Sequence, residues 1–375
     1  MTIRKISARE PMDYKLRAGR AGMTRLALLF SIGVLGVLIV GCDSADRNPE
    51  QFQGFVQPEG FPEPVYNFSR NEVTKDGFEL GKRLFFEPRL SRDNTIACGS
   101  CHIQTAAFTH HGHDVSHGID DQLGIRNPQP IMNLAWAGGF FWDGGVFDLD
   151  LVAINAITSP VEMDENIPNV LKKLREHPEY PGLFKKAFGT VEITDARFFK
   201  ALSQYMLLAV SDNSDYDKVR RKEAVFTPGQ LAGYRVFEKH CASCHAEPLL
   251  TDQSFRNNGL APNPVDDQGR IDVTLNAADK YKFKVPSLRN WEYTAPYMHD
   301  GRFLTLNRVI EHYRTGMVNS ETLDSAFRNE DGSIGIQMTE EEKGQLIEFL
   351  QTLNDRDFVV NPLLAEPAIN SPFKK

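Results

Sequence analysis

Cysteine is scarce in this chain of 375 residues, and the scarcity limits how the fold can be stabilised. There are five cysteines, and four of them form two Cys-x-x-Cys pairs, so no pair is left for a disulfide elsewhere. An excess of basic residues is also lacking: 42 Lys and Arg stand against 50 Asp and Glu, a formal net charge of −8. Because a nucleic-acid partner requires a basic face, this balance argues against one.

Long apolar runs are also few, and the one that stands out covers residues 26–41, directly after Arg25. It is short for a membrane span and suits the apolar part of a signal peptide. The run ends in a Leu-Ile-Val-Gly-Cys sequence that looks like a bacterial lipobox, so we predict a lipoprotein-type signal peptide over 1–41 and lipidation of Cys42. Met23 is the better start, since residues 1–22 add nothing that a signal peptide needs. A short uncleaved anchor is the alternative, and either reading tethers the protein to a membrane and places its folded part in the periplasm.

Both cysteine pairs are followed directly by a histidine. A Cys-x-x-Cys pair alone could be a thiol redox pair or half of a zinc site, but the added histidine favours c-type haem attachment. In that chemistry the two thiols bond the porphyrin vinyl groups and the histidine coordinates the iron. We therefore predict two covalently bound haem c groups and export from the cytoplasm. The two motifs are Cys98-Gly99-Ser100-Cys101-His102 and Cys241-Ala242-Ser243-Cys244-His245.

An internal echo predicts two haem domains in series. Gly81-Lys82-Arg83-Leu84-Phe85 precedes the first motif and Gly233-Tyr234-Arg235-Val236-Phe237 precedes the second. A glycine at the same place on both stretches would let a macrocycle or another helix approach closely. We expect a linker over 42–65, an N-terminal haem domain over 66–215, a C-terminal haem domain over 216–355 and a tail over 356–375.

Helical signals dominate this part of the chain, and strand signals are few. Residues 167–176 and 195–210 have helical apolar spacing, Thr227-Pro228 is typical of a helix start, and Thr339 to Glu342 forms a capping box that opens a helix to about Leu353. The polar stretch 251–282 is predicted to be loop. The expected fold is mainly α, with two c-type-cytochrome-like haem domains in tandem, many loops and little strand.

Three further stretches accompany the two haem motifs. They are Phe140-Phe141-Trp142-Asp143-Gly144, Pro160-Val161-Glu162-Met163, and Val285-Pro286-Ser287-Leu288-Arg289-Asn290 with Thr294-Ala295-Pro296-Tyr297-Met298-His299-Asp300-Gly301. Together with the haem motifs they resemble the bacterial dihaem cytochrome c peroxidases and their MauG-type relatives, over about residues 66–355. The last stretch is the most specific, because ordinary electron-transfer cytochromes lack it.

The resemblance implies His102 and His245 as the proximal iron ligands and Tyr313 as the second axial ligand of the C-terminal haem. In this family that ligand follows the His of the His-Asp-Gly motif by fourteen residues and is Met in the peroxidases or Tyr in the MauG type. A phenolate would lower the reduction potential relative to Met and stabilise ferric iron. Other candidates stay open, namely His312, Met298, Met317 and Met338.

Around the first haem the resemblance is less complete. A removable distal His of the peroxidases aligns with Ile119, so we expect that this His is absent and that the first haem is open or is blocked by another group, with His117 as an alternative ligand. His110, His111 and His113 are expected to form a solvated loop.

Glu162 resembles the distal acid that moves protons during peroxide cleavage, a task for a carboxylate whose pKa is raised by burial. Three neighbouring positions depart from the family: Val152 replaces a Gln, Ala156 a Pro and Gly145 an Arg. These departures put the rate of peroxide turnover in doubt.

Trp142 resembles the tryptophan between the two haems and is expected to carry electrons, whereas Trp136 and Trp291 are expected in the core. Asn127, Thr294 and Pro296 match the family's calcium site, which implies one Ca²⁺ held by hard oxygen donors.

The sequence thus predicts a lipid-anchored peroxidase that reduces hydrogen peroxide at the N-terminal haem with electrons passed through the C-terminal haem. The donor would be a small periplasmic cytochrome c or copper protein. Two alternatives stay open: MauG-like oxidation of residues on a partner protein, and a dihaem electron carrier without substrate chemistry. Whether the protein forms a homodimer is also open.

Overall fold

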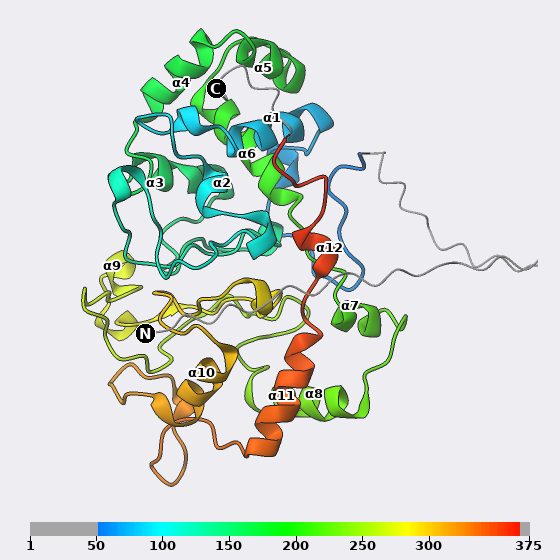
Figure 1. The fold of residues 1–375 in the computed structure, drawn as a ribbon, viewed down its shortest axis with the longest axis vertical. Coiled ribbons are helices and arrows are strands. Elements are labelled where there is room, and N and C mark those ends of the chain that lie inside the picture. The colour runs from blue at the N-terminus through cyan, green and yellow to red at the C-terminus, as the bar shows by residue number, and fades with distance from the viewer. Residues whose placement is uncertain (1–51, 368–375) are drawn as a thin grey trace, which may run out of the picture. The chain divides into compact units, whose positions relative to one another are not determined.

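The structure is a computed structural model that describes residues 52–367 (Figure 1). The predicted signal peptide, Met23 and Cys42 lie outside the described residues. The described chain is mainly helical, as predicted, and contains one two-stranded antiparallel sheet in which Phe255 pairs with Lys284. The elements are α1 (Lys75–Phe85), α2 (Cys98–Cys101), α3 (Val152–Thr158), α4 (Ile167–Glu176), α5 (Tyr180–Phe188), α6 (Asp195–Leu207), α7 (Asp215–Arg220), α8 (Pro228–His240), β1 (Phe255–Arg256), α9 (Ile271–Thr274), β2 (Phe283–Lys284), α10 (Leu306–Glu311), α11 (Glu340–Gln351) and α12 (Arg356–Val359).

Two helix pairs with the same construction organise two hydrophobic cores. In the first core α1 packs on α6, and in the second α8 packs on α11 (Figure 1). A Cβ atom at Gly81 would lie 1.8 Å from the carbonyl oxygen of Ala201, and one at Gly233 would lie 1.9 Å from that of Gln345. Only glycine permits these approaches, so the repeated glycine serves helix contact rather than contact with a macrocycle.

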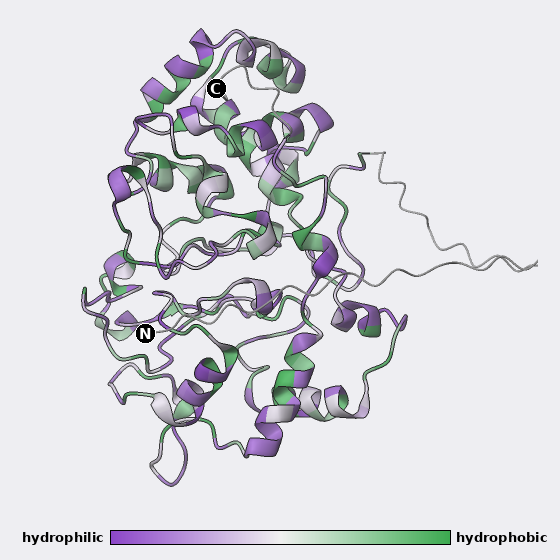
Figure 2. Ribbon diagram, viewed as in Figure 1, coloured by the Kyte–Doolittle hydropathy of each residue, from purple (hydrophilic) through white to green (hydrophobic). Residues whose placement is uncertain are grey.

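Local signals set the boundaries of these helices. The side chains of Thr74, Thr194, Thr227 and Thr339 each accept a hydrogen bond from a backbone N–H in the first turn of α1, α6, α8 and α11 respectively. Capping boxes complete the last two starts, with Gln230 and Glu342 as the reciprocal partners. In α6, almost every residue from Phe198 to Leu207 is buried, and Figure 2 shows the apolar residues of this helix in green among paler and purple polar ones.

Both ends of the described chain pack against the first core. Phe61 is buried, and the indole Nε1 of Trp136 donates a hydrogen bond of 2.7 Å to the carbonyl of Pro62, so residues 52–65 of the predicted linker contribute to packing. After α11 the chain returns, α12 buries Phe358 in the first core, and the hydroxyl of Tyr205 donates to the carbonyl of Leu364 at 2.7 Å. The first residues of the predicted tail therefore form part of the N-terminal core.

Most of the remaining chain is irregular, including the predicted loop 251–282, which carries only β1, α9 and a short turn. Within residues 52–367, none of the helices is both long and apolar enough to cross a membrane. The second haem motif begins at Cys241, directly after α8, whereas the first begins at Cys98, after the loop that follows α1.

Candidate functional site

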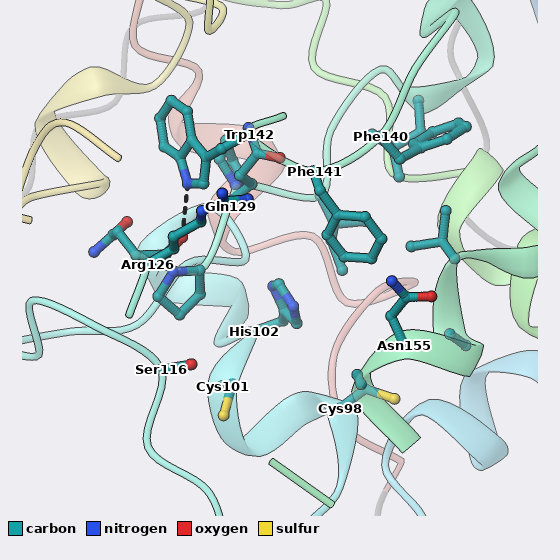
Figure 3. A pocket seen from close by; sticks show the side chains of 18 of the residues that line it. Cys98, Cys101, His102, Ser116, Arg126, Gln129, Phe140, Phe141, Trp142 and Asn155 are labelled. Atoms are coloured by element: carbon teal, nitrogen blue, oxygen red, sulfur yellow. Dashed lines mark hydrogen bonds between the residues drawn. The ribbon is translucent and has the colours of Figure 1, made fainter. Parts of the chain in front are cut away.

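The first haem motif lines a cavity of about 920 Å³, in the upper part of the range of about 300–1,000 Å³ that is typical of ligand pockets. Cys98 and Cys101 begin and end the single turn of α2, and neither thiol is in a disulfide. Figure 3 shows both thiols on one side of His102, with Trp142 and Arg126 on the other. The lining also includes residues of the C-terminal half, such as Lys284 and Pro286, so the cavity lies where the two halves of the fold meet.

The ring of His102 is held in one orientation by its backbone surroundings. Its Nδ1 atom lies 2.7 Å from the carbonyl oxygen of Phe108, which favours a proton on Nδ1 and leaves Nε2 able to coordinate a metal. Burial lowers the pKa of His102, partly opposed by this hydrogen bond, so the ring stays neutral as a ligand must be.

Glu162 lies in the same cavity, in the turn that follows α3. Burial raises the pKa of its carboxyl group, and only a long hydrogen bond of 3.4 Å from the hydroxyl of Ser116 opposes this. The backbone fixes the turn, because the N–H of Ile119 donates to the carbonyl of Glu162 at 2.8 Å. The sequence does not predict this role for Ser116, because no motif distinguishes a single serine in a histidine-rich loop.

The three departures from the family pattern all line this cavity. Val152 and Ala156 lie on one face of α3, and Gly145 lies on the loop before it. Neither Val152 nor Ala156 offers a polar group, but Asn155 between them directs its amide into the cavity (Figure 3).

Trp142 joins the two halves through its side chain and its backbone. Its indole Nε1 donates to the carbonyl of Asn127 at 2.9 Å, and its own carbonyl accepts from the N–H of Lys284 at 2.7 Å. The N–H of Asn127 donates to the carbonyl of His299 at 2.7 Å. Trp142 is therefore fixed at the junction, whereas Trp136 is buried in the first core and Trp291 packs against the second.

The second motif repeats the construction of the first. Cys241 and Cys244 are free of disulfides, and Nδ1 of His245 lies 3.2 Å from the carbonyl of Leu250 and 3.1 Å from that of Pro286. Burial lowers the pKa of His245 as well. Each site thus offers two thiols and an oriented neutral imidazole, the donor set that haem c requires.

Tyr313 lies in a π-helical turn, His312–Gly316, directly after α10. Burial raises the pKa of its phenol, and the thiols of Cys244 and Cys241 are near enough to raise it further. The side-chain amide of Asn258 reaches both the Tyr313 hydroxyl, at 3.4 Å, and the sulfur of Met298, at 3.6 Å. Tyr313 and Met298 are thus the two candidates beside the second motif.

The other candidates for this position have different surroundings. Nε2 of His312 lies 2.9 Å from the carbonyl of Asn258, while Met317 and Met338 are buried in hydrophobic clusters. These contacts favour structural roles for all three.

The histidines after the first motif form a row of rings beside the cavity. The ring centroids of His110 and His113 are 4.3 Å apart, and those of His113 and His117 are 5.4 Å apart. Nε2 of His117 lies 3.3 Å from a carboxylate oxygen of Asp121, whereas its neighbours Ser116 and Gly118 line the cavity. The ring of His117 is thereby engaged outside the lining.

Of the three residues expected to hold calcium, Asn127 contacts the C-terminal half through its backbone N–H, which donates to the carbonyl of His299. The amide nitrogen of Asn127 donates to the carbonyl of Asp114 at 3.0 Å, and the hydroxyl of Thr294 donates to that of Trp291 at 3.1 Å. This leaves amide and carbonyl oxygens, the donors that calcium prefers. Across 52–367 there is no cluster of three or more His, Cys, Asp or Glu residues that could hold a metal ion.

Comparisons with known proteins agree with this geometry. The family described as "Di-haem cytochrome c peroxidase" matches residues 75–225. The chain is 32% identical to the methylamine utilization protein MauG of Methylorubrum extorquens over 80% of this chain and 83% of the relative. It is 36% identical to the cytochrome c551 peroxidase of Nitrosomonas europaea over 66% of this chain and 75% of the relative.

Solved structures give the same answer. A MauG-like protein associated with microbial copper homeostasis has a TM-score of 0.74 and 30% identity, with 83% of this chain and 98% of that chain covered. The diheme peroxidase BthA of Burkholderia thailandensis, at 23% identity and a TM-score of 0.66, shares the fold. The family implies two haem c groups and a peroxidase-like oxidoreductase, in agreement with the two motifs. The chain belongs to the family of dihaem cytochrome c peroxidases and MauG proteins.

Proposed function

We propose that the protein faces the periplasm and reduces hydrogen peroxide at the haem attached to Cys98 and Cys101, with electrons supplied through the second haem. The observation that carries this proposal is the carboxyl group of Glu162, which lies in the same cavity as His102 and has a raised pKa. When bound, haem supplies an iron that can bind peroxide and store oxidising equivalents.

In this proposal Glu162 is the catalytic acid and base. Its carboxylate would take a proton from one oxygen of the peroxide and return it to the other, which would then leave as water, while the bound haem would supply the two electrons that breaking the O–O bond requires. Ser116, which donates to Oε1 of Glu162, orients the carboxylate. The apolar faces of Val152 and Ala156 restrict water in the cavity without adding a second proton donor.

Trp142 and Tyr313 have the electron-transfer roles. Trp142 offers an aromatic path at the junction. Tyr313, together with His245, would hold the second haem, and as a phenolate it would stabilise the oxidised states of that haem. Burial raises the pKa of the Tyr313 phenol in the protein without haem. The positive charge of a bound iron would lower this pKa and favour the phenolate.

A second function, oxidation of residues on a partner protein, is favoured by Tyr313 and by the similarity to MauG. An electron carrier without substrate chemistry is the third reading. Electron paramagnetic resonance of the ferric protein separates these cases first, because the carrier requires two six-coordinate low-spin haems. High-spin iron before or after partial reduction would support the enzyme, and its complete absence would contradict it.

Turnover then separates the two enzymes. We expect reduced cytochrome c or a reduced copper protein to be oxidised at the expense of peroxide. If peroxide oxidises the haems but neither donor returns electrons at a useful rate, the partner-protein reaction is the better account.

The same proposal includes three further features. These are attachment to the membrane through a lipid on Cys42, one Ca²⁺ at Asn127, Thr294 and Pro296, and domains over 66–215 and 216–355. Mass spectrometry of the mature N-terminus tests the lipid. The calcium site is tested by removing Ca²⁺ with a chelator. The haem absorption spectrum should then change, and added Ca²⁺ should restore it.

A further inference from the structure

Lys284 is a charged residue in the first cavity that the proposed reaction does not use. It ends β2 and lines the cavity, its backbone N–H binds the carbonyl of Trp142, and its Nζ donates to the carbonyl of Gly139 at 3.1 Å. Burial lowers the pKa of its ammonium group to about 8, with the charge of Asp143 opposing the shift. Removing an ammonium group from water costs free energy unless a counter-charge binds it, so an anion that pairs with Lys284 would stabilise its charged form.

No carboxylate of the described chain forms an ion pair with Lys284. Asp143, the acid whose charge it senses, is bound instead by Arg126. Arg126 in turn also binds Asp267, at 2.7 Å, so this second cation of the lining is already neutralised by two carboxylates. Among the cations that line the cavity, Lys284 therefore has N–H groups free to donate further hydrogen bonds and has no carboxylate partner among the described residues.

The orientation of the missing group follows from the thiols. A haem attached through its vinyl groups has these at one edge and its two propionates at the opposite edge. Cys98 and Cys101 lie on one side of His102, and Trp142, whose carbonyl binds the backbone of Lys284, lies on the other (Figure 3). A haem attached to these thiols would therefore direct its propionate edge toward the end of the cavity where Trp142 and the backbone of Lys284 lie.

We propose that Nζ of Lys284 binds a propionate carboxylate of the haem attached to Cys98 and Cys101. This contact supplies the missing counter-charge and turns the propionate edge toward β2 and Trp142. It makes Lys284 a positioning residue for the haem. The proposal depends on covalent haem at the first motif, not on which substrate the protein oxidises.

The test uses holoprotein with Lys284→Gln, which removes the charge, and Lys284→Arg, which keeps it. Lys282→Gln is the matched control, because it removes a lysine two positions away that pairs with Asp279 and does not line the cavity. In Lys284→Gln we expect a shift of the propionate bending mode in the resonance Raman spectrum and a lower reduction potential of the first haem, since a nearby cation favours the added electron. Lys284→Arg should restore both values, and Lys282→Gln should leave both unchanged.

Unchanged spectra and potential in Lys284→Gln would overturn the proposal even if peroxide turnover persists, so its failure is distinct from failure of the proposed function. If that variant does not incorporate haem, a crystal structure of the unaltered holoprotein decides. Nζ within about 3 Å of a propionate oxygen supports the contact. Nζ bound only to Gly139 contradicts it.

Discussion

The indole N–H of Trp142 donates a hydrogen bond of 2.9 Å to the carbonyl oxygen of Asn127, whose own N–H binds the carbonyl of His299. The aromatic ring at the junction is thus tied to the backbone of both halves, and to the Asn127 that is expected to hold calcium. A ring fixed in this way suits the electron path between the haems that we propose for Trp142.

Trp142→Phe should therefore slow the exchange of electrons between the haems. The phenylalanine keeps the aromatic bulk but loses the hydrogen bond and is harder to oxidise, so we expect peroxide turnover to fall below that of the unaltered protein. The lost hydrogen bond should reduce stability by about 0.5–1.5 kcal/mol. Stopped-flow absorption at both haems and denaturant unfolding measure the two effects.

Trp136→Phe is the control for this change. It also removes an indole N–H bonded to a carbonyl, that of Pro62 at 2.7 Å, but Trp136 does not line the cavity. A comparable loss of stability with normal electron exchange is expected. Equal slowing in both variants would show that the effect of Trp142 is structural.

Glu162→Gln should reduce the rate with peroxide by about 10²–10⁴-fold, the usual contribution of a positioned acid or base. In the unaltered protein the carboxylate must be ionised to accept the first proton. Since burial raises the pKa of Glu162, the rate should rise with pH through a pKa above the ordinary glutamate value, and this dependence should vanish in the variant. Stopped-flow measurement of the peroxide reaction between pH 4 and 8 tests both statements.

Glu165→Gln provides the comparison within the same segment. Glu165 is also buried, but it pairs with Lys173 at 2.7 Å and does not line the cavity. We expect lower stability and a normal peroxide rate. A normal rate in Glu162→Gln would remove this residue from the mechanism.

Tyr313→Phe should change the spectrum of the second haem, because the phenolate oxygen would no longer be available to the iron. Tyr313→Met should raise the reduction potential of that haem, since thioether coordination favours the reduced state. Met298→Leu tests the other neighbour of Asn258 and should leave the spectrum unchanged. The reverse pattern, with sensitivity at Met298 alone, would reassign the ligand.

The sequence predicts this protein well where information is local. The starts of α8 and α11 follow from Thr227 and Thr339 because an N-cap acts within one turn of helix. The repeated Gly81 and Gly233 predict close approach, but the partner helices, α6 and α11, come from distant sequence and appear only in the structure. Tertiary contacts also explain why the proline-containing residues 52–65, which the sequence predicts to be a linker, pack against the first core. In this segment the ring of Phe61 contacts that of Trp136.

The site divides in the same way. Each haem motif is a short local pattern of two cysteines and a histidine, so the sequence alone predicts the residues that attach the haem. Ser116 and Lys284 could not be, because their importance comes from what folding places beside them, a buried carboxyl group in one case and a lack of carboxylates in the other.

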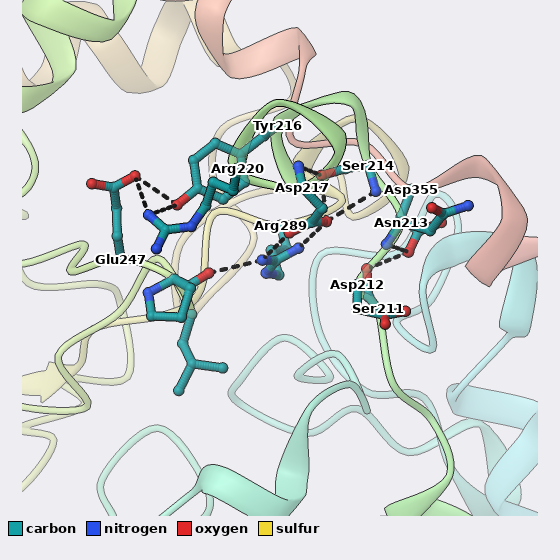
Figure 4. Close-up of polar contacts among 12 residues, drawn as sticks. Ser211, Asp212, Asn213, Ser214, Tyr216, Asp217, Arg220, Glu247, Arg289 and Asp355 are labelled. Carbon is teal, nitrogen blue, oxygen red and sulfur yellow. Dashed lines mark hydrogen bonds and ion pairs between the residues drawn. The ribbon is translucent and has the colours of Figure 1, made fainter. Parts of the chain in front are cut away.

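The buried pair of Asp217 and Arg289 gives a prediction on stability (Figure 4). Both guanidinium Nη atoms donate to the carboxylate at 2.7 Å, and Nη2 also donates to the carbonyl of Pro248 beside the second haem motif. Burial alone would raise the pKa of Asp217, but the hydrogen bonds from Arg289 and Ser214 outweigh it and hold the pKa below its usual value. Arg289→Met leaves a buried charge without a partner and should destabilise the fold by about 3–5 kcal/mol.

The sign of the pH dependence follows from the lowered pKa of Asp217. Its contribution is complete above the pKa of the unfolded chain and is lost as pH falls through the lower pKa of the folded state. Denaturant unfolding at pH 7 and at decreasing acidic pH should therefore show the gap between Arg289→Met and the unaltered protein closing toward low pH. Arg70→Gln, which breaks an exposed pair with Asp148, should cost no more than about 1 kcal/mol at any pH. A gap for Arg289→Met that stays constant down to the lowest pH would show that the loss comes from packing, since Arg289 also lies over the ring of Phe61, rather than from the charge of Asp217.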